Sequence, residues 1–149
     1  MTDVVKELNE LIQLDVDAIK AYDQAIEACE HDSVKLKLNE FRADHARHIT
    51  DLSAHVTALG GVPEVKQDFK GYLIEGFTAI TSIGTHSALM SMQGNEMLTN
   101  KSYEAALKLD LAPDIRDTLV RNFSDEQRHL AWIKEAIHLR VWDKEYKAA

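Results

Sequence analysis

Apolar residues recur at intervals of three and four along four long stretches of the chain. In the first stretch, Val5, Leu8, Ile12 and Ile19 follow this spacing, which is typical of an amphipathic helix with one buried face. The same periodicity in the other stretches indicates further helices of similar length. The pattern predicts four helices, at residues 3–31, 33–59, 86–109 and 113–142.

The connections between these helices differ in length. Gly60 and Gly61 end the second helix, and residues 60–85 then form a long crossover, in which we expect a short helix around residues 69–83. Short turns join the helices of each pair. Two helical hairpins joined by one long connection are typical of a ferritin-like four-helix bundle. We therefore predict an all-α fold, with residues 1–149 as a single domain.

We expect the apolar stripe of each helix to lie in the core of this bundle. On the second helix the stripe includes Leu36 near its start and Leu59 at its end. On the third helix, Met90, Met92 and Met97 are expected to fill irregular gaps in the core, because methionine is flexible and apolar.

Composition and charge narrow the class of protein. The chain has 149 residues, of which 45% are hydrophobic and 28% charged, as expected for one globular domain. Its net charge of −8 argues against a nucleic acid or an anionic membrane as partner, because phosphate binding needs a basic surface. The N-terminus is polar and acidic, unlike a signal peptide, and no stretch is apolar enough to span a membrane. We expect a cytoplasmic protein.

A cluster of acidic and histidine residues occurs in both halves of the chain. Residues 44–48 read DHARH and residues 125–129 read DEQRH, an offset of 81 residues (129 − 48). Carboxylates and imidazoles repeated on facing helices are how a helical bundle builds a two-metal centre. The same offset relates two further pairs of residues, Asp15 with Glu96 and Tyr22 with Tyr103.

These residues are predicted to lie at one level of the bundle. Asp15 and His48 lie 17 and 16 residues from the first turn at Asp32, and Glu96 and His129 lie 16 and 17 residues from the second turn. At about 1.5 Å of rise per residue, all four lie about 25 Å from their turns. Antiparallel helices therefore bring them together near mid-bundle.

The spacing of these residues suits metal ligation. Glu126 and His129 are three residues apart and share one helix face, as in the ExxH half-site of carboxylate-bridged bundles. On the second helix, His45 and His48 occupy the corresponding positions. His45 stands where a glutamate is expected, and either binds metal or points outward while Asp44 takes its place. The candidate metal ligands are Asp15, His45, His48, Glu96, Glu126 and His129.

On these motifs the chain resembles the ferritin-like di-metal carboxylate proteins. It is similar to the rubrerythrin and bacterioferritin branch, and most of all to small stand-alone bacterial bundles of unassigned function. The resemblance implies that Asp44 and Asp125 hydrogen-bond metal-bound histidines. It also implies that Tyr22 and Tyr103 hydrogen-bond ligand carboxylates, although both tyrosines can equally be plain core aromatics.

The chain departs from the family pattern at two positions. Asp15 is one methylene shorter than the usual glutamate, and His45 removes one bridging carboxylate. The ligand set then carries three formal negative charges instead of four, which favours weaker binding, a single metal, or an exogenous bridge such as oxide or hydroxide. Oxygen and nitrogen donors suit iron or manganese, and zinc also tolerates them. We expect two metal ions, with iron favoured over manganese or zinc.

Other polar residues are expected to lie outside this centre. Arg47 and Arg128 are predicted to be surface salt-bridge residues that the duplication repeats. His55 and His86 are predicted to be structural or surface residues.

These observations favour a non-haem di-iron or di-manganese protein that oxidises Fe(II) or reduces O₂ or peroxide. Cys29 is the single cysteine of the sequence, so the sequence contains no CxxC motif of the kind found in a rubredoxin-like module. A peroxidase activity would therefore need an external electron donor. The alternatives are a metal-binding or sensing module without turnover, and a structural or partner-binding bundle that has lost its metals.

The crossover is the expected oligomer surface. Gly71, Gly76 and Gly84 fall within its apolar part and favour close packing. We expect this segment to pair two subunits into a homodimer.

Overall fold

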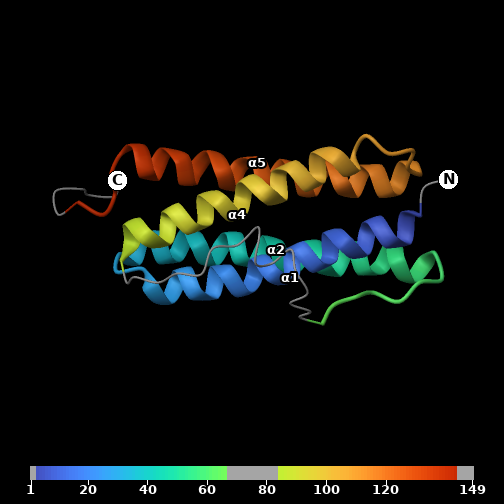
Figure 1. The fold of residues 1–149 in the computed structure, drawn as a ribbon, viewed down its shortest axis with the longest axis horizontal. Coiled ribbons are helices and arrows are strands. Elements are labelled where there is room, and N and C mark those ends of the chain that lie inside the picture. The colour runs from blue at the N-terminus through green and yellow to red at the C-terminus, as the bar shows by residue number, and fades with distance from the viewer. Residues whose placement is uncertain (1–2, 67–83, 144–149) are drawn as a thin grey trace.

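The computed structural model describes residues 3–66 and 84–143, which form four long helices. The protein is an all-α four-helix bundle, as predicted (Figure 1). Its helices are α1 (Val4–Ala28), α2 (Asp32–Ala58), α4 (Thr85–Ala106) and α5 (Pro113–His138).

The four helices form two antiparallel hairpins that pack on each other. α1 packs against α2, α4 packs against α5, and the hairpins meet mainly through α1 and α4 (Figure 1). α2 ends at one end of the bundle and α4 begins at the opposite end. The two helix ends that the long connection joins therefore lie at opposite ends of the bundle, which is the ferritin-like arrangement.

Local sequence determines where several helices begin and end. The Asp3 side chain accepts a hydrogen bond from the Lys6 backbone N–H at 3.1 Å and so caps the start of α1. Gly60, after α2, adopts a φ of 83°, which glycine reaches without steric cost. The Gly61 N–H then donates to the Val56 carbonyl at 2.9 Å. This bond satisfies a carbonyl at the end of the helix.

The fourth helix is shorter than its apolar pattern indicates. α5 ends at His138, whereas the pattern continues to residue 142. Arg140 adopts a left-handed φ of 53°, and the Val141 N–H returns to the Ala136 carbonyl at 3.2 Å. This reversal ends the helix although apolar residues follow it.

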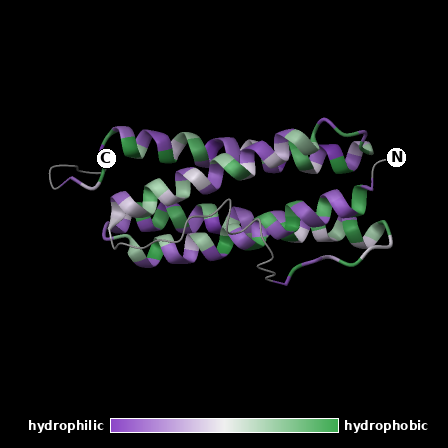
Figure 2. Ribbon diagram, in the orientation of Figure 1, coloured by the Kyte–Doolittle hydropathy of each residue, from purple (hydrophilic) through white to green (hydrophobic). Residues whose placement is uncertain are grey.

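Two hydrophobic clusters fill the bundle, with a polar layer between them. One cluster contains Tyr22 and Leu89, and the other contains Ile12 and Leu119. Burial of each large apolar side chain contributes about 1.5–3 kcal/mol. Figure 2 shows hydrophobic and hydrophilic residues on every helix. Six residues of the polar layer, each 0% exposed, are Asp15, His45, His48, Glu96, Glu126 and His129.

The predicted apolar stripe of the second helix is wrong at two positions. Leu36 is 70% exposed and Leu59 is 49% exposed. Val34 and Leu38 are buried, and Leu36 lies midway between them, on the opposite side of a helix with 3.6 residues per turn. Leu59 follows the last residue of α2 and lies at the end of the bundle.

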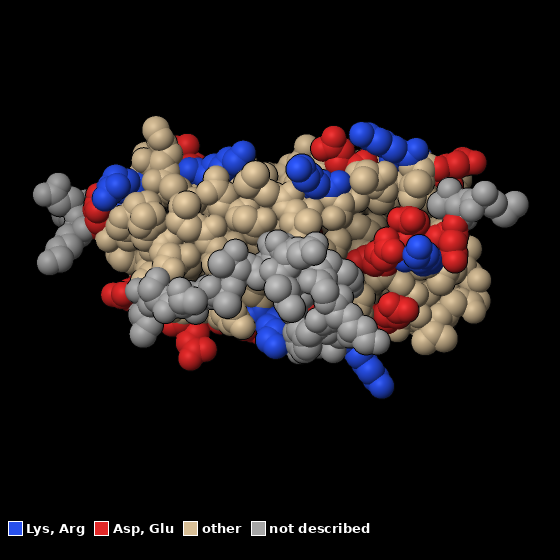
Figure 3. Space-filling model, in the orientation of Figure 1, with Lys and Arg blue, Asp and Glu red and all other residues tan. Residues whose placement is uncertain are grey.

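The prediction that three methionines of the third helix lie in the core holds for one of them. Met92 is buried, whereas Met90 and Met97 are each 49% exposed. Met90 and Met97 are seven residues apart and so share a face of α4. Charged side chains are sparse over the first half of α4 on the face that Figure 3 shows.

Part of the crossover lies outside the described residues. This part includes the short helix expected around residues 69–83, together with Gly71 and Gly76 of the expected homodimer surface. Both expectations stay predictions. Within residues 3–66 and 84–143, no helix is long and apolar enough to cross a membrane.

Candidate metal centre

All four helices contribute a predicted ligand to the polar layer at the middle of the bundle. α1 provides Asp15, α2 provides His45 and His48, α4 provides Glu96, and α5 completes the set. Their nitrogen and oxygen atoms form two groups that can each hold a metal ion. The groups are Asp15, His45, His48 and Glu126, and His45, Glu96, Glu126 and His129.

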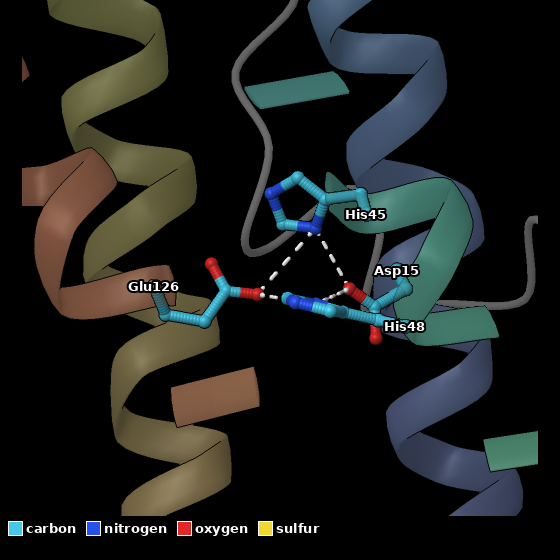
Figure 4. Close-up of side chains that lie close together, drawn as sticks. All are labelled: Asp15, His45, His48 and Glu126. Atoms are coloured by element: carbon cyan, nitrogen blue, oxygen red, sulfur yellow. Dashed lines mark hydrogen bonds and ion pairs between the residues drawn. The ribbon is translucent and has the colours of Figure 1, made fainter. Parts of the chain in front are cut away.

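The first group surrounds a single point between the hairpins (Figure 4). Asp15 Oδ1 lies 2.7 Å from His45 Nδ1 and 3.2 Å from His48 Nδ1. Glu126 Oε1 lies 3.4 Å from each of these two nitrogens. With metal–ligand bonds of about 2.0–2.2 Å, the donors of a tetrahedral ion lie about 3.4 Å apart. The four donors are therefore spaced to bind one ion after small adjustments.

The second group has similar spacing and shares two residues with the first. Glu96 Oε1 lies 3.0 Å from His45 Nε2 and 3.3 Å from His129 Nδ1. Glu126 uses its other oxygen, Oε2, which lies 3.7 Å from His129 Nδ1. His45 and Glu126 thus lie between two adjacent sites.

One oxygen of the centre is left without a hydrogen bond. Glu126 Oε1 is buried and has no hydrogen-bond partner among the described residues. Burial, together with the charge of Glu96, raises the pKa of Glu126. A buried carboxylate oxygen without a donor is costly. The nearest nitrogens, His45 Nδ1 and His48 Nδ1, lie 3.4 Å away and form no hydrogen bond with this oxygen. A metal ion bound between them would contact Glu126 directly, so the donor set fits a bound metal.

Two aspartates orient the histidines of the centre from outside. Asp44 Oδ2 lies 2.8 Å from His129 Nε2, and Asp125 Oδ2 lies 2.9 Å from His48 Nε2. When the neutral imidazole donates from Nε2, its Nδ1 carries the free lone pair. Both Nδ1 atoms face the buried carboxylates, as in metal sites where an outer carboxylate fixes the histidine tautomer.

Two arginines complete this arrangement at the surface, where the sequence predicted salt bridges. Arg128 pairs with Asp44 at 2.6 Å, and Arg47 pairs with Asp125. The arginine side chains are 52% and 46% exposed. Each outer aspartate is therefore neutralised on its solvent side and holds a histidine on its inner side.

The two repeated tyrosines donate hydrogen bonds to the carboxylates of the opposite hairpin. The Tyr103 hydroxyl donates to Asp15 Oδ2 at 2.8 Å, and the Tyr22 hydroxyl donates to Glu96 Oε1. Burial and the neighbouring carboxylates raise the pKa of both tyrosines well above its ordinary value. The hydroxyls therefore stay protonated and keep donating.

The residues repeated at the offset of 81 pair across the two hairpins. For each hydrogen bond from the first hairpin to the second, the equivalent residues form a bond from the second hairpin to the first. The centre therefore has approximate two-fold symmetry. The symmetry is broken where His45 stands opposite Glu126. The reciprocal pairs are Tyr22 with Glu96, Tyr103 with Asp15, Asp44 with His129, and Asp125 with His48.

The sequence repeat did not reveal two further residues of the centre. The Thr99 hydroxyl lies 3.2 Å from Glu96 Oε2 and 3.1 Å from Glu126 Oε2. Asn100 Nδ2 donates to the backbone carbonyls of the same two glutamates, at 2.7 and 3.0 Å. The residue that corresponds to Thr99 in the first half is Ala18 (99 − 81). The available signal was the spacing of three residues between Glu96 and Thr99 on one helix face.

Opposite charges dominate the electrostatics of the centre. Burial lowers the pKa of His48, but the hydrogen bond and charge of Asp15 outweigh burial and raise it to about 10. For His129, the neighbouring carboxylates of Asp44, Glu126 and Glu96 likewise outweigh burial and raise the pKa to about 9. Without metal, the protonated imidazoles neutralise the buried carboxylates.

The other two histidines singled out by sequence lie outside this centre, as predicted. His55 Nε2 lies 2.8 Å from the Thr118 hydroxyl. The His86 ring stacks on Trp142 with ring centroids 4.0 Å apart. His55 therefore provides a control position for experiments on the metal centre.

Comparison with protein families relates this geometry to known sequences. Residues 3–109 match the model of a family described as a domain of unknown function, DUF2383. The chain belongs to the DUF2383 family. The match includes the DUF2383 protein's helices α1, α2 and α4 and ends before α5. No curated protein sequence matches the chain.

Among solved structures, the DUF2383 protein is similar to a two-domain protein from Anabaena variabilis that contains DJ-1/ThiJ/PfpI-like and ferritin-like domains. The TM-score is 0.78 at 15% sequence identity. The match covers 100% of the DUF2383 chain and 41% of the longer chain. At this identity the likeness shows the ferritin-like fold alone.

Proposed function

We propose that this DUF2383 protein is a non-haem di-metal protein that handles Fe(II), O₂ or peroxide. The observation that carries the proposal is the pair of buried donor groups that share His45 and Glu126. Their nitrogen and oxygen atoms suit iron best, with manganese or zinc as alternatives. The ferritin-like fold supports a further proposal, that the protein is a relative of the rubrerythrin and bacterioferritin branch.

The residues around the centre would prepare it for redox chemistry. When bound, two adjacent reducible metals can together exchange two electrons with O₂ or peroxide. The two hydrophobic clusters on either side of the polar layer would exclude bulk water. Tyr22 and Tyr103 hold Glu96 and Asp15 in place. A peroxidase cycle would draw its electrons from an external donor.

A metal-binding or sensing role without turnover is the second candidate. The observation that favours it is His45, which replaces a carboxylate and leaves three carboxylates among the six candidate ligands. A structural bundle without metals is less consistent with the centre, because the buried Glu126 Oε1 would then have the two histidine nitrogens at 3.4 Å beside it but no hydrogen bond.

Iron loading followed by oxidation separates these functions. Metal-free protein titrated with Fe(II) under anaerobic conditions is expected to bind about two ions per chain. On addition of O₂ or peroxide, oxidant consumption should then exceed that of the same Fe(II) in buffer. His129→Ala should lose most of this excess, and His55→Ala should retain it.

Each outcome of this experiment has a defined meaning. Bound iron that consumes oxidant no faster than iron in buffer would favour the binding or sensing role. Absence of iron, manganese and zinc binding in the folded wild-type chain would contradict both metal-dependent functions.

A further inference from the structure

The imidazole ring of His45 lies between the two donor groups and presents a different nitrogen to each. Nδ1 lies 2.7 Å from Asp15 Oδ1 and 3.4 Å from Glu126 Oε1. Nε2, on the other side of the ring, lies 3.0 Å from Glu96 Oε1. We propose that His45 bridges the two metal ions and binds one through each ring nitrogen. This inference rests on the proposed di-metal function.

His45 differs from the other two histidines of the centre in its partners. His48 and His129 each contact an outer aspartate through Nε2, so that Nδ1 alone is free to bind metal. Both ring nitrogens of His45 contact carboxylates of the donor groups instead. Its ring is therefore positioned to bind on both sides.

The charge of the centre supports this assignment. Two divalent ions bring four positive charges into a fully buried layer, and the donor groups contain three carboxylates. When both nitrogens of His45 bind metal, the ring gives up its remaining N–H proton to solvent and becomes an imidazolate. The imidazolate provides the fourth negative charge, which offsets the cost of burying an unbalanced charge.

The outer aspartates do not change this balance. Asp44 and Asp125 are paired with Arg128 and Arg47, so their charges are offset at the surface. Among the described residues that contact the donor groups, the outer aspartates are already paired, which leaves the donor groups themselves or an added anion to provide the fourth charge. His45 provides it without an added bridge.

A bridging imidazolate fixes the distance between the metals. With one metal–nitrogen bond of about 2.0–2.1 Å on each side of the ring, the ions lie roughly 6 Å apart. Two-metal sites with short bridges have a separation of about 3.5–4 Å. Glu126 is compatible with the longer distance, because Oε1 and Oε2 belong to different donor groups. The metal–metal distance therefore separates the two arrangements.

Crystals of the full-length wild-type protein loaded with Zn²⁺ alone provide the direct test. We expect two anomalous-scattering peaks roughly 6 Å apart, each bonded to one ring nitrogen of His45. Two peaks about 3.5–4 Å apart, one peak, or a His45 ring bonded to one ion would overturn the bridge while leaving metal binding intact. No peak in the centre would overturn the bridge and the di-metal function together.

Zinc affinities of variants test the same inference in solution. In competition with a chromophoric chelator, His45→Ala should lower the binding affinity for both zinc ions by at least about tenfold. His48→Ala or His129→Ala should lower the affinity for mainly one of the two ions, and His55→Ala should change neither affinity. If His45→Ala lowers the affinity for only one of the two ions, the bridge would be overturned. Circular dichroism checks the fold, and if His45→Ala does not fold, the crystal experiment on the wild type decides.

Discussion

The outer aspartates determine which nitrogen of two central histidines is free to bind metal. Asp125 holds His48 and Asp44 holds His129, in both cases through Nε2. A carboxylate in this position also increases the basicity of the imidazole. The surface arginines Arg128 and Arg47 pair with these aspartates on the solvent side.

We predict that Asp125→Asn lowers zinc affinity by about 10–100-fold. The asparagine still accepts a hydrogen bond from His48 but no longer carries the charge that strengthens its ligation. The matched control is Arg47→Gln, which removes one of the two arginines that pair with Asp125 and keeps the aspartate. Chelator competition measures both variants, and equal losses of affinity would contradict a specific role for the aspartate.

The stability of the metal-free protein should depend on pH in a defined direction. In the folded state the pKa of His48 is about 10 and that of His129 is about 9, against about 6.5 in the unfolded chain. Between these values the folded state binds more protons, so the free energy of unfolding falls as pH rises. The contribution of these histidines is complete below about pH 6.5 and is lost through about pH 10.

Denaturant unfolding in the presence of a chelator measures this dependence. We expect the metal-free protein to be more stable at pH 6.5 than at pH 9.5, and zinc affinity to change in the opposite sense, because metal displaces protons from the histidines. A stability that stays level or rises over this interval would show that the folded-state pKa values are not raised.

At the scale of the element, each helix is specified by the residues that it buries. On α2, Leu38 is 0% exposed and Leu36, two residues earlier, is 70% exposed. Both are leucines in the same helix and differ in the direction of their side chains. They form a matched pair for measuring how strongly the core holds α2.

We predict that Leu38→Ala destabilises the protein by about 2–5 kcal/mol, because it leaves a cavity in the core. Leu36→Ala should change the free energy of unfolding by about 0.5 kcal/mol or less, as expected at the surface. Urea unfolding measures both. Similar losses for the two variants would indicate that Leu36 is buried in the solution state by another chain.

The fold class was predictable because its signals are local and repeated. The helical spacing of apolar residues and the glycines after α2 indicate where helices form and where one of them ends. The spacing did not indicate whether Leu36 on α2, or Met90 and Met97 on α4, point to the core or to solvent. Apolar residues occur on more than one side of these helices. Packing against the other helices decides which side is buried.

The centre was predictable in composition and not in geometry. The offset of 81 residues brings six candidate ligands to one level, and the structure places all six in one buried layer. The direction of the His45 ring depends on side-chain torsions that spacing does not encode. Thr99 could not be found from the repeat, since its counterpart is Ala18.

At the scale of the whole molecule, the polar layer divides the hydrophobic core into two clusters. Burying three carboxylates and three imidazoles costs free energy that their mutual hydrogen bonds only partly recover. Ligands that bind the folded state alone raise its stability by mass action. The bundle is therefore expected to be most stable with its metals bound.

The central claim is that the middle of this bundle binds metal, and the metal content of the purified protein tests it most directly. Full-length protein from a culture rich in iron and manganese, purified without chelator, should contain about one to two equivalents of transition metal by mass spectrometry. His129→Ala should lower this content, and His55→Ala should leave it unchanged. Less than about 0.2 equivalents in the wild type, unaffected by His129→Ala, would contradict the claim.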